Sequence, residues 1–174
     1  MSINAQDVAA LRGVLSALGY DTDPESADTP ARLLTVLRDF APGQPLPTLD
    51  TFAAPAAGDE VQLLALPFYS LCAHHLLPFF GTVDVVYLPV ERIAGLGAIA
   101  RAVRHFSRQP QLQERLGAQL AEHLHVALGA PVAVRVRARQ LCMEMRGVES
   151  TGEIVTVARR GSGSGSAGLF SANP

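Results

Sequence analysis

Apolar residues recur at helical spacing near the amino terminus of the chain. Between positions 8 and 18 they fall on one face and Gly19 follows them, which predicts a short amphipathic helix. A second helix is predicted to begin at Thr29, a suitable N-cap, with Pro30 as its first helical residue. The apolar face of this second helix is formed by Leu33, Leu34, Leu37 and Phe40.

Two segments of the chain show little periodicity. The stretch 41–57 is rich in proline, alanine and threonine and is interpreted as a linker, so residues 1–57 are predicted to form an N-terminal helical arm with its linker. The end of the chain, 162–174, is rich in glycine and serine and is predicted to be a flexible tail. Residues 58–161 are then the main domain.

The hydrophobic pattern of this main domain switches between the two-residue period of strands and the longer period of helices. The predicted elements are strands 60–71 and 82–88, helices 96–108 and 111–128, and strands 133–139 and 153–157. This order predicts an α+β fold with an antiparallel sheet and two helices on one of its faces.

Composition and charge narrow the class of protein. The chain has 174 residues, a net charge of −2 and no basic block, so the electrostatic footprint of a duplex-binding protein is missing and no nucleic-acid partner is expected. Its apolar runs are too short for a membrane span, and its polar first residues do not resemble a signal peptide, which favours the cytoplasm. All 14 basic residues are arginine, so any anion would be bound by guanidinium groups.

The segment Cys72-Ala73-His74-His75 is the first candidate for chemistry. It is either part of a metal site or a thiol and two imidazoles in an apolar segment. The second cysteine, Cys142, follows a predicted strand that could run beside the first segment, and a disulfide would be the alternative. Cys72, His75 and Cys142 with a water would form an open tetrahedral zinc site, and the imidazole of His74 could transfer protons.

Three longer motifs carry a resemblance to a known family. The segments "CAHHLLPFFGTVDVVYLP", "GLGAIARAVRHFSRQPQLQERL" and "QLCMEMRGV" together resemble GTP cyclohydrolase I, over about residues 29–170. The resemblance implies a tunnelling fold (T-fold), a ring-shaped homodecamer with active sites between subunits, and a zinc ion bound by Cys72, His75 and Cys142. It also implies attack of water at C8 of guanine, loss of formate and rearrangement to dihydroneopterin triphosphate.

The resemblance further implies the residues that contact the substrate. His74 corresponds to a catalytic histidine of the family, and Gln140 stands where the family has another. Gln113 and Glu114 match the pair that binds guanine, although Glu114 taken alone could be an ordinary solvated helix residue. The other substrate-binding positions that the resemblance implies are Leu96, Arg32, Arg101 and Arg146.

Several of these positions depart from the family pattern. Ala73 replaces a glutamate, and glutamine at position 140 can form hydrogen bonds but cannot shuttle a proton at neutral pH. Gly97 and Ala98 replace a serine and a lysine of the phosphate site, and Thr35 replaces another lysine. The sequence therefore predicts a zinc-dependent hydrolase that attacks C8 of a guanine-like purine with fewer phosphates than GTP.

Two other functions remain open at this point. One is an ordinary GTP cyclohydrolase I in which neighbouring arginines such as Arg104 compensate for the lost lysines. The other is a non-catalytic purine-binding homologue that keeps the fold and the metal. A nitrile reductase of the queuosine type is disfavoured by the C-x-H-H pattern, because such enzymes use a nucleophilic cysteine and no zinc there. In each remaining case the expected partners are a purine and further copies of the chain, without a membrane.

Overall fold

The computed structural model describes residues 3–55 and 59–161. The chain divides into two compact units, Met1–Ala41 and Pro42–Pro174. The predicted flexible tail, 162–174, lies outside the described residues. Within the described ranges, no helix is both long enough and apolar enough to cross a membrane.

The first unit contains the predicted helices. They are α1 (Ala5–Ala17), the short 3-10 helix η1 (Pro24–Ser26) and α2 (Thr29–Asp39). The prediction that Thr29 caps α2 is wrong by one residue, because Asp28 is the N-cap and Thr29 is already helical. The carboxylate of Asp28 does not cap the helix; it pairs with Arg32 at 3.2 Å, one turn further along.

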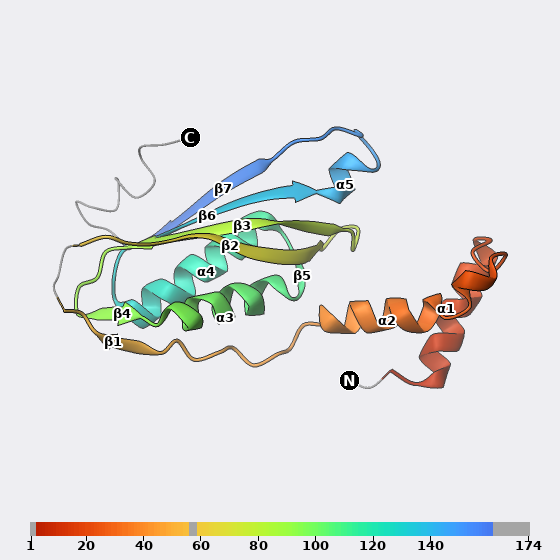
Figure 1. Cartoon of the computed structure of the whole chain (residues 1–174), viewed down its shortest axis with the longest axis horizontal. Helices are drawn as coiled ribbons and strands as arrows, with labels where there is room; N and C mark the ends of the chain where they lie inside the picture. The colour runs from red at the N-terminus through yellow and green to blue at the C-terminus, as the bar shows by residue number, and fades with distance from the viewer. Residues whose placement is uncertain (1–2, 56–58, 162–174) are drawn as a thin grey trace. The chain divides into compact units, whose positions relative to one another are not determined.

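The second unit is built around a five-stranded sheet with strand order β5-β2-β3-β6-β7. All neighbouring strands in it are antiparallel except β5, which runs parallel to the end of β2. Figure 1 shows helices α3 and α4 along one face of this sheet, which confirms the predicted α+β architecture. The elements are β1 (Thr51–Ala53), β2 (Val61–Cys72), β3 (Pro78–Tyr87), β4 (Arg92–Ala94), α3 (Leu96–Ser107), β5 (Pro110–Gln111), α4 (Gln113–Leu128), β6 (Val132–Gln140), α5 (Leu141–Glu144) and β7 (Ile154–Arg160).

Two boundaries differ from the sequence prediction for structural reasons. Strand β1 lies inside the segment interpreted as a linker, where Phe52 pairs with Ile93 of β4. The second long helix begins at Gln113 rather than at Gln111, because Gln111 extends the sheet beside Cys72. The buried amide of Gln111 also donates to the carbonyl of Phe106 at 3.1 Å, which ties the end of α3 to this strand.

The hydrophobic core fills the space between the helices and the sheet. Val83 and Val85 of β3 are completely buried on this face, as their alternation with Thr82 and Asp84 predicts. Leu116, Leu120 and Leu124 form the buried stripe of α4 that packs against them. The sheet is therefore anchored to the helices along most of the length of β3.

The opposite face of the sheet carries a buried carboxylate. Asp84 is 2% exposed and accepts hydrogen bonds from Arg135 at 2.9 Å and from the backbone N–H of Ala65 at 2.8 Å. Arg137 adds a second ion pair at 3.2 Å. Ala65 has a φ of +59° and lies where the register of β2 shifts between Leu63 and Leu66. Asp84 thus satisfies the backbone of a β-bulge and offsets the charge of two arginines.

Replacing Asp84 by alanine is expected to lower the free energy of unfolding by about 3–5 kcal/mol, because a half-buried arginine pair would lose its counter-charge. Urea denaturation followed by circular dichroism measures the effect. The matched control is Glu122→Ala, whose pair with Arg160 at 2.7 Å is solvent-exposed and is worth less than about 1 kcal/mol. Equal losses for the two variants would contradict the structural role of Asp84.

Candidate metal centre and active site

A tight turn at the end of β2 brings Cys72 and His75 together. The carbonyl of Cys72 accepts hydrogen bonds from the N–H groups of His75 at 3.3 Å and Leu76 at 2.8 Å. Leu76 adopts a φ of +54°, a conformation that is rare for a residue with a side chain and that reverses the chain toward β3. As a result, Nδ1 of His75 lies 3.8 Å from Sγ of Cys72.

Cys142 reaches the same place from a distant part of the sequence. Strand β6 pairs with β3 so that Gln140 is opposite Phe79, and the single helical turn α5 follows immediately. The ligand atoms of Cys72, His75 and Cys142 all lie within 4.8 Å of one another. Both cysteines are free thiols, so the structure does not contain the disulfide alternative.

The donor set of this cluster fits a zinc ion. Two sulfurs and one imidazole nitrogen are preferred zinc ligands, and three protein ligands leave one tetrahedral position for water or substrate. Burial raises the pKa of the Cys142 thiol, and the adjacent Cys72 raises this pKa further, while the charge of Arg146 opposes the rise. A bound cation would replace the thiol protons and relieve the repulsion between two neighbouring thiolates.

Gln140 is held beside this cluster by a second buried amide. Its Nε2 donates to Oε1 of Gln113 at 3.0 Å, and its own Oε1 lies 3.7 Å from Sγ of Cys142. Gln113 is only 1% exposed, and its Nε2 donates to the carbonyls of Val136 at 3.0 Å and Ile154 at 2.8 Å. Gln113 therefore ties the start of α4 to β6 and β7 and orients Gln140 toward the cysteine.

The other candidates near the cluster are exposed to solvent. The ring of His74 lies edge-on to that of His75, with 6.1 Å between centroids. Glu114 follows Gln113 in the first turn of α4, and its side chain has no hydrogen bond or ion pair within the described residues. Arg146 follows α5 and is also exposed. These three side chains are accessible to a ligand that binds from solvent.

Leu96 is not brought to this cluster within one chain. The N–H of Ala94, just before α3, donates to the hydroxyl of Tyr87 at the far end of β3 from Pro78. Pro78 pairs with Leu71 beside Cys72, and a strand of 10 residues spans roughly 30 Å. The start of α3 therefore lies at the opposite end of the sheet from Cys72.

Two of the predicted phosphate-binding arginines have acidic partners. Arg101, in the middle of α3, pairs with Asp50 at 2.7 Å, and both side chains are more than half exposed. Arg32 lies on α2 in the first unit, where it pairs with Asp28. The Arg32–Asp28 pair has the i,i+4 spacing that a sequence can show. The Arg101–Asp50 pair and the Gln113–Gln140 bond join residues far apart in the sequence, so no local pattern indicates them.

The fold and the site define an α+β protein with a Cys-His-Cys cluster suited to a metal ion. A family model described as GTP cyclohydrolase I matches residues 8–167, and the chain belongs to this family. Its T-fold is the one that the motifs predicted.

Individual relatives are similar over most of their length. The chain is 44% identical to GTP cyclohydrolase 1 of Lactiplantibacillus plantarum over 149 residues, which cover 82% of this chain and 79% of the relative. It is 39% identical to GTP cyclohydrolase 1 of Aquifex aeolicus, with 92% and 90% covered. Among solved structures, apo archaeosine synthase QueF-Like aligns with a TM-score of 0.44 and 18% identity, over 63% of this chain and 98% of that one, which is too weak to bear on function.

Replacing Gln113 by leucine is expected to lower the free energy of unfolding by about 2–5 kcal/mol, because two backbone carbonyls and the amide of Gln140 would lose a buried partner. Urea denaturation measures this change. The matched control is Glu114→Leu at the next, exposed position, which should change stability by less than about 0.5 kcal/mol. A neutral Gln113→Leu would mean that the amide network contributes little to folding.

Proposed function

We propose that this protein is a zinc-dependent hydrolase that acts at C8 of a guanine-type purine and stops at the ring-opened product. The observation that carries the proposal is the Cys72, His75 and Cys142 cluster, with ligand atoms within 4.8 Å of one another and Gln140 fixed beside it. Family membership supports the hydrolase class. The substrate and the end point of the reaction are inferred from the residues that differ from the family pattern.

Zinc bound by these three residues would supply Lewis-acid activation of water at neutral pH. The exposed imidazole of His74, next to the ligand His75, is the group available to move protons to and from the opening ring. Glu114 offers two acceptor oxygens, which match the N–H and amino donors on one edge of guanine. Each role belongs to a side chain that is either in the cluster or exposed near it.

The end point of the reaction follows from Gln140. Loss of formate and rearrangement to a pterin require further proton transfers, and a carboxamide cannot act as a general acid or base at neutral pH. Because Nε2 of Gln140 is already used by Gln113, the group next to Cys142 is a hydrogen-bond acceptor in a fixed orientation. We therefore expect one bond of the imidazole ring to be hydrolysed. The formyl group should stay attached to the product as an N-formyl amide.

Completion of the site requires further copies of the chain. Leu96 lies at the far end of the sheet from the metal ligands, so it can approach a purine at this site only from a neighbouring protomer. We propose a ring-shaped homo-oligomer with active sites between subunits, as the family resemblance implies. Gly97 and Ala98 supply no cation there, which favours a substrate with fewer phosphates than GTP.

An ordinary GTP cyclohydrolase I is the second candidate. The relatives that carry this name are about 40% identical, for example 40% over 164 residues in Geobacillus kaustophilus, with 87% of that protein covered. Under this alternative the remaining arginines would bind the triphosphate and another group would replace the missing imidazole.

Mass spectrometry of zinc-loaded protein incubated with guanine, guanosine, GMP and GTP distinguishes these functions. A product heavier by one water supports the proposed hydrolase, whereas dihydroneopterin triphosphate and formate from GTP support the ordinary enzyme. Binding without any turnover would instead indicate a non-catalytic purine-binding protein.

Two substitutions test the roles of the site residues. Cys142→Ser should lose most bound zinc in metal analysis, whereas His74→Ala should retain zinc and lose turnover by about 100-fold or more. Parallel loss of zinc in both variants would contradict the assignment of His74.

The variant Gln140→His restores an imidazole and is expected to carry the reaction on to release of formate. Formate is quantified with a coupled dehydrogenase assay, and Gln140→Asn, which remains an amide, is the control. If Gln140→His still accumulated the ring-opened product, residue 140 would not set the end point of the reaction.

A further inference from the structure

The strand that ends at Cys72 has a very short partner on its outer edge. Strand β5 consists of two residues, which pair in parallel with Leu71 and Cys72. The carbonyl of Gln111 in β5 also accepts a hydrogen bond from the N–H of Ala73 at 2.9 Å. A strand of two residues forms too few backbone hydrogen bonds to fix its own position. Other contacts must therefore hold β5 in place beside Cys72.

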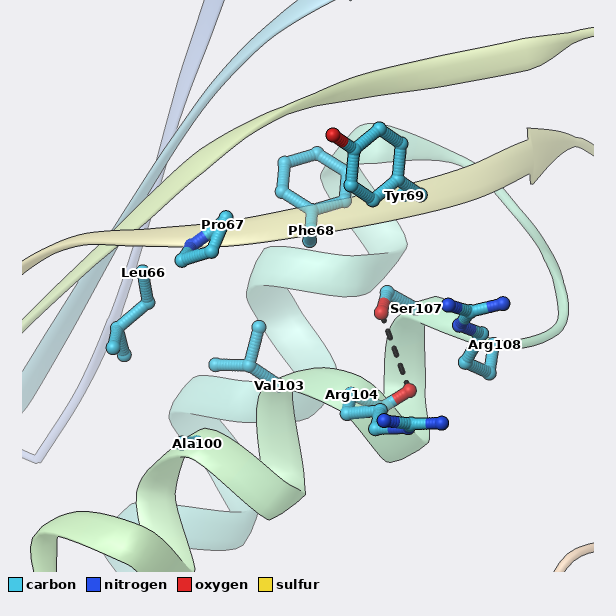
Figure 2. A pocket seen from close by; sticks show the side chains of 9 residues that line it. All are labelled: Leu66, Pro67, Phe68, Tyr69, Ala100, Val103, Arg104, Ser107 and Arg108. Atoms are coloured by element: carbon cyan, nitrogen blue, oxygen red, sulfur yellow. Dashed lines mark hydrogen bonds between the residues drawn. The ribbon is translucent and has the colours of Figure 1, made fainter.

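Direct packing between α3 and β2 is interrupted close to this point. A groove of about 250 Å³ separates the carboxyl-terminal half of α3 from the part of β2 that precedes Cys72 (Figure 2). Its lining includes Phe68 and Tyr69 of β2 and Arg104 and Ser107 of α3. The hydroxyl of Ser107 donates to the carbonyl of Arg104 within the helix at 3.2 Å. The end of α3 is therefore joined to the ligand-bearing strand through the segment that follows the helix.

The side chain of Gln111 forms this junction. It is 1% exposed, and its Nε2 donates to the carbonyl of Phe106 at 3.1 Å and to Oε1 of Gln119 at 2.8 Å. Its Oε1 accepts from the N–H of Leu112 at 3.1 Å and from Nε of Arg115. A carboxamide has two donor hydrogens and one oxygen with two acceptor positions, so every hydrogen-bonding position of this amide is used. One buried group thus connects the end of α3, the start of α4 and β5.

Two further side chains hold the same segment. Nη2 of Arg115 donates to the carbonyl of Pro110 at 2.7 Å, so this arginine bonds to both residues of β5. The buried hydroxyl of Ser70 in β2 donates to the carbonyl of Gln109 at 3.1 Å. Each residue of the segment 109–111 therefore accepts a hydrogen bond from β2 or from α4.

A tie between two helices is the simpler explanation for the buried amide, because buried polar groups are normally hydrogen-bonded wherever they lie. That explanation covers the side-chain bonds of Gln111, but not the bond from its backbone carbonyl to the residue directly after Cys72. His75 follows in the same turn, so a displacement of β5 would move two of the three predicted metal ligands. Zinc–ligand distances vary by only about 0.2 Å, which makes the cluster sensitive to such a displacement.

We propose that Gln111, held by Arg115, is a positioning residue for the metal centre. It fixes the turn that carries Cys72 and His75, so that both side chains are placed before the metal binds. This inference rests on the metal centre of the proposed function and does not depend on the identity of the purine. Groups that orient metal ligands typically change metal affinity by about 10–100-fold when they are removed.

The zinc dissociation constant of the full-length protein, measured by competition with a chromophoric chelator, tests this role. Gln111→Leu is expected to weaken zinc binding by about tenfold or more. The control is Asp84→Ala, which removes a buried hydrogen-bonded group from the other face of the sheet and should leave zinc affinity unchanged. Circular dichroism identifies conditions in which both variants are folded, so a loss of zinc seen only in Gln111→Leu is separate from a general loss of stability.

Arg115→Met keeps the test decisive if Gln111→Leu does not fold. Arg115 is exposed, so its replacement should preserve the fold and weaken zinc binding by about threefold or more. The matched control is Arg160→Met. Nε of Arg160 also bonds to a side-chain oxygen, that of Glu122, and its Nη1 bonds to a backbone carbonyl, but on β7. Zinc affinity should be unchanged in this control.

Cobalt substitution gives a readout of geometry that does not require turnover. The visible absorption bands of the cobalt protein report the arrangement of the thiolate and imidazole ligands, and they should change in Gln111→Leu and Arg115→Met but not in the two controls. The proposal is overturned if the unmodified protein binds no zinc, or if neither variant differs from its control in zinc affinity. Tight zinc binding that depends on Gln111, without hydrolysis of any purine, would contradict the proposed function alone.

Discussion

The pairing of β3 with both β2 and β6 is the constraint on which the site depends. Pairing with β2 sets Leu71 opposite Pro78, and pairing with β6 sets Gln140 opposite Phe79. Two residues at the start of β3 thus bring together the ends of strands that are far apart in the sequence. A shift of one residue in either pairing would reverse the faces of β2 or β6 and displace Cys72 or the turn that carries Cys142, and the three side chains could no longer meet.

This pairing depends in turn on the two faces of the sheet. On one face, β3 is buried against the leucine stripe of α4, and on the other it carries Asp84 between two arginines. The apolar face disfavours a slip of register, because a slip would move the valines of β3 out of the core and would turn the carboxylate of Asp84 into it, away from Arg135 and Arg137. The N–H of Ala65 in the bulge donates to the same carboxylate, so contacts far from Cys72, His75 and Cys142 help to fix the strands that position these residues.

Much of this arrangement could be predicted from the sequence. Alternation and helical periodicity gave the order of the elements, and the C-x-x-H pattern with the second cysteine predicted the cluster that the structure brings together. What depends on long-range contacts could not be predicted. Gln111 looks like the start of a helix until it is paired with Cys72, and the sequence gives no sign that Gln113 forms buried hydrogen bonds to β6 and to Ile154.

The bond between Gln113 and Gln140 separates two duties of position 140. The hydrogen bond needs a donor that reaches Oε1 of Gln113, and the later proton transfers of the family reaction would need a group that titrates. Histidine can meet both requirements, whereas glutamine meets only the first. Under the proposed function, a substitution here would change how far the reaction proceeds while the hydrogen bond that supports the surrounding framework is kept.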